Sequence, residues 1–499
     1  MNLVDHLPAL QVIVPLVCAP LLVLLRSNSM AWLAATVISV MAFIIAVSLT
    51  LGVLHGTEYT YAMGGWPAPY GIALGVDSFS ALVLLVVTGA SSFALLGGFQ
   101  SLNAQIEAER QPLFYSAWLL ALAGLSGIVV TADAFNIFVF MEISALASYV
   151  LIAGGPDRRA LPSVFKYLVM GTIGATFYLI GIGLVYMMTG TLNLADMELR
   201  ISGVADQSPI LVAAGFITIG LALKAAVFPL HAWLPNAYTY APHAVTVFLA
   251  ACATKVSLYV LLRFDFFVFQ QNIDGHPFQF STFLMPLSIL AVLVASSLAI
   301  FERNLKRLLA FSSVAQIGYI LMGASLVSLG GLTASGLHMF NHALAKGALF
   351  LAVACLMTRF SSLQIKDLSG ASRRMPWTMA AFTAAGLSLI GVPGTAGFIS
   401  KWYLLSAALT DSRLGILLAA VIVVSSLLAV AYVWRVIEAA YFSRTDSGLQ
   451  QQAARHEAPL LMLLVTWIAV LANIYFGFNT EIPLALAADA ADSLMGHLR

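Results

Sequence analysis

Apolar runs of about 20 residues recur along the whole chain, and they constrain its fold more than any other feature, because a helix of that length crosses the hydrocarbon core of a bilayer. The sequence is 61% hydrophobic and only 9% charged, whereas soluble domains carry about 25% charged residues. About fourteen runs have the length of a transmembrane helix. They begin near Leu7, Trp32, Phe79, Leu113, Ala134, Pro162, Pro209, His243, Phe283, Leu308, Leu332, Trp377, Leu414 and Leu460. The chain is therefore predicted to be an all-α integral membrane protein, with residues 1–499 forming a single polytopic domain.

Basic residues are distributed unequally between the two sets of alternate loops. One set holds Arg26, Arg110, Arg158, Arg159, Lys166, Arg303, Lys306, Arg307, Arg359, Lys366, Arg373, Arg374, Arg444 and Arg455. The other set holds only Arg200, Arg263, Arg413 and Arg499. Because cytoplasmic loops carry the excess of lysine and arginine, the first set is predicted to be cytoplasmic and both termini to face outward.

The segment Leu221–Arg263 combines a helix break with two intramembrane lysines. Pro229 and Pro235 cannot continue a helical hydrogen-bond ladder, so a broken helix is predicted here. Such breaks survive at membrane depth only where protein or a water-filled cavity satisfies the freed backbone groups. Lys224 precedes the break and Lys255 lies in the next run. Intramembrane charges are costly and usually functional, so the segment predicts movement of a charged species across the membrane.

A second break is predicted around Pro393, within LSLIGVPGTAGFISKWY, and Lys401 follows it. Five-helix units that start at the fourth and ninth runs both place their break in the fourth helix. An odd number of spans per unit makes the two repeats inverted, and interrupted helices at matching positions point to a transport site. The predicted organisation is helices 1–3 in residues 1–110, a first repeat of helices 4–8 in 111–266, a second repeat of helices 9–13 in 280–445, and helix 14 with a tail in 456–499.

Glu142 is the carboxylate predicted to lie deepest in the membrane, in the middle of FNIFVFMEISALASYVLIA. An unpaired carboxylate there would be very costly, so we expect it to pair with Lys224. Desolvation disfavours the charged lysine and the carboxylate favours it, and a group balanced in this way can take and release a proton. A static structural ion pair is the alternative.

Two further lysines are predicted to be buried in the membrane. Lys255 lies about twelve residues into its run, too far from a helix end for its ammonium to reach water easily. Lys401 follows the second break and either joins the same set of groups or extends toward the membrane interface.

The run LHMFNHALAKGALFLAVACL places His338, His342 and Lys346 four residues apart, so they lie on one face of a helix. Imidazoles titrate near neutral pH and pass protons in either direction, which favours a proton relay. Hydrogen-bonded core histidines are an alternative. A metal site is another, but this HxxxH pair has no partnering glutamate and none is predicted.

No signature of a cofactor, metal or nucleic-acid site is present. Cys18, Cys252 and Cys355 are scattered through apolar runs without metal-ligand spacing. The chain has no Gly-rich nucleotide-binding motif and no haem motif. Its formal net charge of +1 argues against nucleic acid as a partner.

Several motifs resemble the proton-conducting antiporter-like subunits, a family that includes the large membrane-arm subunits of complex I, membrane-bound hydrogenase subunits and the large subunits of Mrp-type antiporters. The similar segments are KAAVFPLHAWLPNAYTYAPHAV, TKVSLYVLLR, MEISALASYVLIA, KRLLAFSSVAQIGYILMG and GVPGTAGFISKW. The length and the segments TKVSLYVLLR and SKWYLL look most like the D-type subunits of Mrp antiporters. The GVPGTAG motif departs from the proline-rich version of many members.

The resemblance implies fourteen helices, two inverted five-helix repeats and a central polar axis. By resemblance, the key glutamate is Glu142, and the broken-helix, bridging and terminal lysines are Lys224, Lys255 and Lys401. The eleventh-helix histidines correspond to His338 and His342. The family also implies work inside a multisubunit complex, without a redox cofactor on this chain.

Our leading hypothesis is a proton-translocating subunit of a multisubunit Na⁺/H⁺ antiporter in a bacterial cell membrane, with other subunits, H⁺, Na⁺ and lipid as its partners. It would be a secondary transporter subunit and not an enzyme. The alternative is a proton-pumping membrane-arm subunit of a redox complex, either NADH:quinone oxidoreductase or a membrane-bound hydrogenase. A membrane scaffold without transport is a third hypothesis, which the number of buried ionisable groups disfavours.

Overall fold

The computed structural model describes residues 3–205, 207–269, 280–411, 413–443 and 456–495. Among these residues, twelve helices are long and apolar enough to cross a membrane. Two broken helices supply the other predicted spans, so the expectation of about fourteen is confirmed. The unbroken spans are α1 (Leu7–Val23), α2 (Asn28–Leu54), α3 (Ser78–Gln105), α4 (Gln111–Val130), α5 (Ala134–Ala153), α6 (Ala160–Thr189), α10 (His243–Leu262), α11 (Phe280–Phe301), α12 (Leu305–Ala324), α13 (Leu329–Leu356), α17 (Gly415–Tyr441) and α18 (Leu460–Phe478).

The shorter elements complete the chain. The broken spans are α8 (Ser208–Lys224) with α9 (Leu234–Tyr240), and α15 (Pro376–Ile390) with α16 (Ala396–Asp411). The remaining labelled elements are β1 (Tyr59–Ala62), β2 (Ala73–Val76), α7 (Leu194–Ile201), α14 (Ala371–Arg374) and α19 (Glu481–Met495). The two strands form an antiparallel hairpin in which Tyr59 faces Val76, an element that the sequence did not predict.

Polar side chains define the starts of several spans. The carboxylate of Asp77 accepts a hydrogen bond from the Ser80 amide at 2.8 Å, at the start of α3. Asp133 accepts one from the Asn136 amide at 2.7 Å, at the start of α5. These caps satisfy amides that have no partner within the helix, which fixes where each helix begins.

The first broken helix is held by its own side chains. Helix α8 ends at Lys224, and Ala226 then adopts a positive φ of 56°. The indole of Trp233 donates a hydrogen bond at 3.0 Å to the Leu223 carbonyl, which also accepts a longer bond of 3.3 Å from the Ala226 amide. Protein groups thus satisfy the backbone at this break.

The second broken helix ends on a glycine. Gly391 has a φ of 92°, a backbone conformation that residues other than glycine rarely adopt. Its amide and that of Val392 both donate to the Leu387 carbonyl, and α16 starts at Ala396. Both breaks occur in the fourth span of a five-span unit, as predicted. The proposed boundaries of the two units at 111–266 and 280–445 remain predictions.

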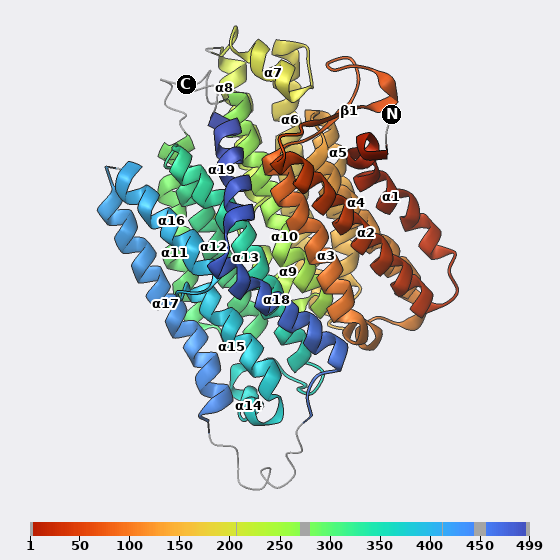
Figure 1. The fold of residues 1–499 in the computed structure, drawn as a ribbon, viewed down its shortest axis with the longest axis vertical. Helices are drawn as coiled ribbons and strands as arrows, with labels where there is room; N and C mark the ends of the chain where they lie inside the picture. The colour runs from red at the N-terminus through yellow and green to blue at the C-terminus, as the bar shows by residue number, and fades with distance from the viewer. Residues whose placement is uncertain (1–2, 206, 270–279, 412, 444–455, 496–499) are drawn as a thin grey trace.

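Three of the four most buried spans lie where the two five-helix units meet. The apolar windows of α10, α12 and α13 are 89% buried, as is that of α4, whereas those of α2 and α17 are 28% and 39% buried. Helix α10 packs on α13, and α9 packs on α12. Figure 1 shows α1 and α2 on one side of the molecule, α16 and α17 on the other, and α10, α12 and α13 between them. The centre of the molecule is therefore built from both units.

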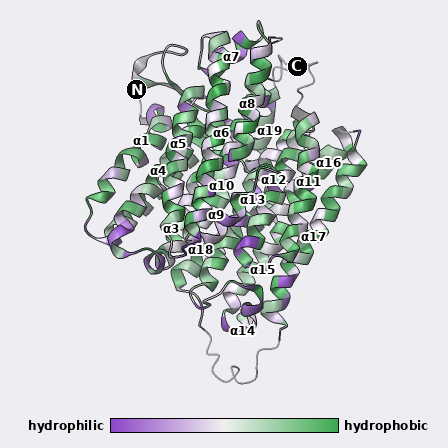
Figure 2. Cartoon of the chain, turned by 180° about the vertical axis from the view of Figure 1, so that it is seen from behind, coloured by the Kyte–Doolittle hydropathy of each residue, from purple (hydrophilic) through white to green (hydrophobic). Residues whose placement is uncertain are grey.

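The outer surfaces of the helices are apolar. Large side chains on α17, such as Ile416 and Leu427, are 83% and 64% exposed, and Figure 2 shows hydrophobic residues over most of the helices. In Figure 1, α7, the hairpin and the start of α1 lie at the same end as α19, and α14 lies at the other. Which end faces the cytoplasm remains a prediction.

Candidate functional site

Glu142 and Lys224 form an ion pair between α5 and α8. The Lys224 ammonium lies 3.1 Å from a Glu142 carboxylate oxygen, with side-chain exposures of 6% and 30%. The lysine is thus enclosed while the carboxylate reaches toward the outside of the chain. The geometry is the one we expected, and it provides an acid and a base in direct contact.

Close helix packing positions Lys224. A Cβ atom added at Gly220 would lie 2.5 Å from the Gly174 carbonyl oxygen, so glycines let α6 and α8 approach each other. The same approach brings Gly174 against the Lys224 side chain. Close packing of the two backbones therefore fixes the position of Lys224 at the end of α8, directly before the break.

Two tyrosines beside the ion pair were not predicted. Tyr149 and Tyr167 lie near Glu142, with their rings 4.8 Å apart. Tyr167 also stacks on Trp233 at 4.0 Å. Tyr149 lies two turns after Glu142 on α5, so spacing alone could have placed it on the same face. Tyr167 and Trp233 belong to other segments and reach this cluster only in the fold.

Lys255 is buried in the middle of α10, where its ammonium donates a hydrogen bond to the Ala250 carbonyl. It lies within electrostatic range of His338, His342 and Lys346 on α13. Its side chain does not extend to a membrane interface, so the predicted burial is correct. Among the residues that the structure describes, no direct hydrogen bond joins it to Lys224.

His338 has hydrogen-bond partners suited to both of its protonation states. Its Nδ1 lies 2.8 Å from the Ser400 hydroxyl and its Nε2 lies 2.9 Å from the Gln316 carbonyl oxygen. A neutral ring donates to Gln316 and accepts from Ser400. A charged ring donates to both, and the Ser400 hydroxyl can then donate to the Gly397 carbonyl 3.3 Å away. Gaining or losing a proton therefore leaves no unpaired group.

His342 is arranged differently. It is buried, its ring is nearly parallel to that of His338 at 6.1 Å, and neither ring nitrogen has a hydrogen-bond partner among the described residues. Both of its nitrogens are therefore available to a proton donor or acceptor that approaches the ring. The predicted stripe on α13 is therefore present, and its two histidines have distinct environments.

The two remaining lysines bind oxygen atoms of neighbouring helices. Lys346 donates to the Leu309 carbonyl at 2.6 Å and to the Ser312 hydroxyl on α12. Lys401 donates to the carbonyls of Leu389 and Ile390 at 3.2 and 2.8 Å, which are the last carbonyls of α15. Lys401 therefore satisfies the last carbonyls of the helix before the break, and its side chain stays buried instead of reaching the surface.

The ring of Tyr319 connects these groups. The Lys401 ammonium lies 5.0 Å from the centre of this ring, and His338 lies 5.6 Å from it. The structure thus brings six of the seven predicted residues into two groups: Glu142 with Lys224, and His338, His342, Lys346 and Lys401. Lys255 lies within electrostatic range of the second group, on α10, the helix of the first unit that packs on α13 of the second.

Further polar residues outside the predicted set are enclosed by the fold, and three of them have charged or titratable side chains with informative contacts. Lys306, which we expected in a basic loop, is buried at the start of α12, and His243 is buried at the start of α10. Arg263, expected in an outer loop, donates to Asp77 at 2.6 Å. Burial raises the pKa of Asp77, but the charge and hydrogen bonds of Arg263 outweigh it and hold that pKa below its usual value.

The described residues contain no group of three or more histidine, cysteine, aspartate or glutamate side chains that could hold a metal ion. The arrangement places several groups that can donate and accept protons in the interior of the chain. Proton transfer between fixed side chains is a reaction that such groups can support.

Comparisons with known proteins agree on the family. Residues 131–429 match the family described as NADH:quinone oxidoreductase/Mrp antiporter, TM. The chain is 40% identical over 458 residues to the N subunit of NADH-quinone oxidoreductase from Desulforudis audaxviator, covering 91% of this chain and 89% of that one. It is 28% identical to the D-type subunit of the Na⁺/H⁺ antiporter from Bacillus subtilis, covering 97% and 96%.

Solved structures give the same result. A chain of the Mrp complex from Dietzia sp. superposes with a TM-score of 0.90 at 26% identity, covering 99% of this chain and 98% of that one. A chain of an archaeal membrane-bound sulfane sulfur reductase superposes with a TM-score of 0.89 at 29% identity, covering 98% of both. The match to more than half of the chain confirms the resemblance seen in its motifs: this protein belongs to the NADH:quinone oxidoreductase/Mrp antiporter transmembrane family.

Proposed function

We propose that the chain is the proton-translocating membrane subunit of a multisubunit Na⁺/H⁺ antiporter, of the D type found in Mrp complexes, and not an enzyme. The observation that carries the proposal is a series of ionisable groups in the interior, of which all but the partly exposed Glu142 are buried. The series consists of Glu142, Lys224, Lys255, His338, His342, Lys346 and Lys401. Ionisable groups inside a membrane are costly, and here both five-helix units contribute them. Similarity to D-type antiporter subunits over nearly the whole chain supports this choice.

Transfer would start at the ion pair. At an effective dielectric constant of about 20, two charges about 4 Å apart attract by about 4 kcal/mol. Protonation of Glu142 removes that attraction, so the charged form of Lys224 becomes costlier in its buried site and releases its proton inward. Lys255 then passes the charge to the α13 residues, and Lys401 is the terminal group.

The full assembly belongs to the proposal as well. The chain would work in a bacterial cell membrane, with both termini on the outer side and other subunits as partners. The partially exposed carboxylate of Glu142 is suited to exchange protons near such a neighbouring subunit. Sodium would be the exchanged cation.

A second candidate is a proton-pumping subunit of a redox complex. The 40% identity to the N subunit of an NADH-quinone oxidoreductase favours it. The same buried series would serve, but electron transfer in a partner would drive it. The two candidates differ in what drives the protons, and the proton path is common to both.

Ion-flux measurements in membrane vesicles distinguish the two candidate functions. Inverted membrane vesicles from a strain without other antiporters, expressing the whole operon, are tested for Na⁺-dependent dissipation of a proton gradient. We expect activity that is lost in Glu142→Gln, which keeps the shape of the side chain but cannot ionise. Proton movement only with NADH or another electron donor would favour the redox complex, and a fully active Glu142→Gln would contradict a proton path through this residue.

A further inference from the structure

Lys306 is a buried lysine for which the series described above gives no role. Its side chain is at the start of α12 and is 1% exposed, although it lies in a segment rich in surface charges. Its ammonium donates a hydrogen bond at 2.7 Å to the carbonyl of Ala241, directly after α9. No salt bridge to Lys306 is found within the part of the chain that the structure describes. A buried ammonium held by one carbonyl is costly to keep charged.

His243 is a second unexplained group, two residues after the Ala241 carbonyl that holds Lys306. This histidine is the first residue of α10, is 8% exposed, and has no hydrogen-bond partner for its Nδ1 among the described residues. It lies within electrostatic range of Lys306. Its backbone amide donates to the Gln105 side chain at 3.0 Å, which fixes its place. An unpaired imidazole nitrogen on the segment that holds a buried amine can take part in passing a proton to it.

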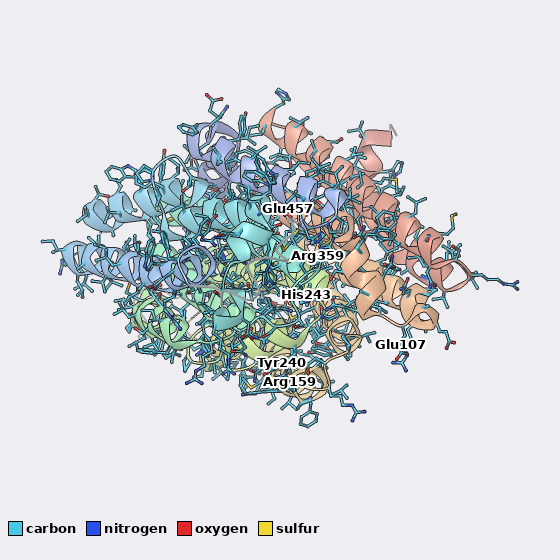
Figure 3. The ribbon with its side chains drawn as sticks, turned by 90° about the horizontal axis from the view of Figure 1, so that it is seen from below. Glu107, Arg159, Tyr240, His243, Arg359 and Glu457 are labelled. Atoms are coloured by element: carbon cyan, nitrogen blue, oxygen red, sulfur yellow. The ribbon has the colours of Figure 1, made fainter. Side chains whose placement is uncertain are left out.

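The groups around this pair form a gradient of exposure. Asp157, which interacts electrostatically with Lys306, has a side chain that is 33% exposed and also pairs with Arg159. His243 is nearly buried, and Lys306 and Lys346 are fully buried. Figure 3 views the molecule from below and places His243 near the middle of this face, between Arg359 on one side and Tyr240 and Arg159 on the other. Tyr240, covered by the Arg159 guanidinium, directly precedes Ala241.

Helix α12 connects Lys306 to the buried series. Lys346 donates to the carbonyl of Leu309, which is three residues after Lys306 and so about 4.5 Å further along the helix axis. Gln316, two turns beyond Leu309 on the same helix, binds His338. Helix α12 therefore carries polar contacts from Lys306, at its start, to Lys346 and His338 of the buried series.

We propose that His243 and Lys306 form a proton-loading site, through which the second five-helix unit takes up protons from the end of the molecule where α14 lies. Neutral His243 accepts a proton from water on one ring nitrogen and releases one from the other to the neutral amine of Lys306. The Lys306 ammonium then passes its proton toward Lys346 and returns to the amine. This inference rests on the proposed proton-translocating function and adds a point of entry to it.

A structural tie is the competing explanation, because a lysine at the C-terminal end of α9 also stabilises that helix end. The two explanations differ for Lys306→Arg. Arginine keeps the charge and can donate to the Ala241 carbonyl, but it does not release its proton. Lys306→Met removes both the charge and the hydrogen bond. If Lys306 has only a structural role, Lys306→Arg should remain active and Lys306→Met should not. If Lys306 loads protons, both variants should lose activity.

The test uses the whole complex reconstituted in liposomes, with assembly checked by gel filtration and initial rates of Na⁺-driven proton flux measured. Lys306→Arg and Lys306→Met should each lower the rate about tenfold or more, as expected for loss of a proton-transfer group. His243→Gln should shift half-maximal rate to a higher proton concentration on the loading side. Arg307→Gln, which removes an exposed neighbouring charge paired with Glu302, should leave the rate unchanged.

Glu142→Gln is measured in parallel. If it is inactive while Lys306→Arg and His243→Gln match the wild type, the loading site is wrong and the proposed function stands. If Lys306→Arg is active and only Lys306→Met fails, Lys306 is a structural tie. If Glu142→Gln is itself fully active, the proton path through Glu142 is wrong. If the wild-type complex shows no Na⁺-driven proton flux, the proposed function fails, and the loading site fails with it.

Discussion

At the scale of single residues, the buried charges are of two kinds. Some have a fixed counter-ion, as Asp77 has in Arg263. Others are held mainly by carbonyl and hydroxyl oxygens, as Lys255, Lys346 and Lys401 are. An ammonium without a carboxylate can lose its proton without leaving a buried anion behind. The second kind is therefore suited to transfer. The Asp77–Arg263 pair is suited to stability, because arginine does not release its proton, whereas Lys224 beside Glu142 can release its proton once the carboxylate is protonated.

Asp77→Asn tests the stabilising kind. Because Arg263 holds the pKa of Asp77 below its usual value, the pair stabilises the fold at any pH above that usual value. Its contribution is lost as the pH falls through the lowered pKa. We expect Asp77→Asn to reduce stability at pH 7 by about 1.5–3 kcal/mol, the range for a hydrogen bond to a charged group.

The measurement is thermal unfolding of the purified complex in detergent over a series of pH values. The difference in Tm between Asp77→Asn and the wild type should shrink as the pH falls below about 4. An equal difference at about pH 7 and at about pH 3 would show that the charge of Asp77 does not carry its effect.

At the scale of helices, close packing decides where the lysines lie. The Glu142–Lys224 distance depends on α6 and α8 meeting at Gly174 and Gly220. The breaks were predictable, because proline or glycine residues cluster at each of them, around Pro229 and around Pro393. Single prolines, such as Pro286 inside α11, leave their helix unbroken. The stripe on α13 was predictable as well, because residues four apart share a face. The partners of Lys306, Arg263 and Tyr167 were not, because each contact joins helices far apart in the chain.

Gly220→Ala tests the packing. A Cβ atom there would lie 2.5 Å from the Gly174 carbonyl oxygen and 2.8 Å from the Tyr178 amide, so α8 must move away from α6. We expect a loss of about 1–3 kcal/mol in stability, typical of overpacking, together with slower proton flux.

Gly183→Ala is the matched control. Gly183 is also helical and has no atom within 4 Å of an added Cβ. Alanine is favoured over glycine by about 1 kcal/mol in a helix, so this variant should be as stable as the wild type or more so. Equal effects of the two substitutions on flux, measured in the same liposomes, would argue against packing as the cause.

At the scale of the whole molecule, the buried series joins two units of inverted topology. Helix α10 of the first unit packs on α13 of the second, and Lys255 lies at that contact. The overall architecture followed from the apolar runs, and the family from short motifs. Whether the groups form one connected path depends on three-dimensional placement, which no periodicity in the sequence specifies.

Lys255→Met tests this connection most directly. The variant keeps an unbranched side chain of similar length but cannot carry a proton, and it leaves Glu142 and Lys401 in place. Ser257→Ala, which removes a hydroxyl bonded within α10, is the control on the same helix. Na⁺-driven proton flux is measured in liposomes containing the assembled complex. The account predicts that Lys255→Met reduces flux about tenfold or more while Ser257→Ala does not. Flux near the wild-type rate in Lys255→Met would show that protons do not pass between the two units through this lysine.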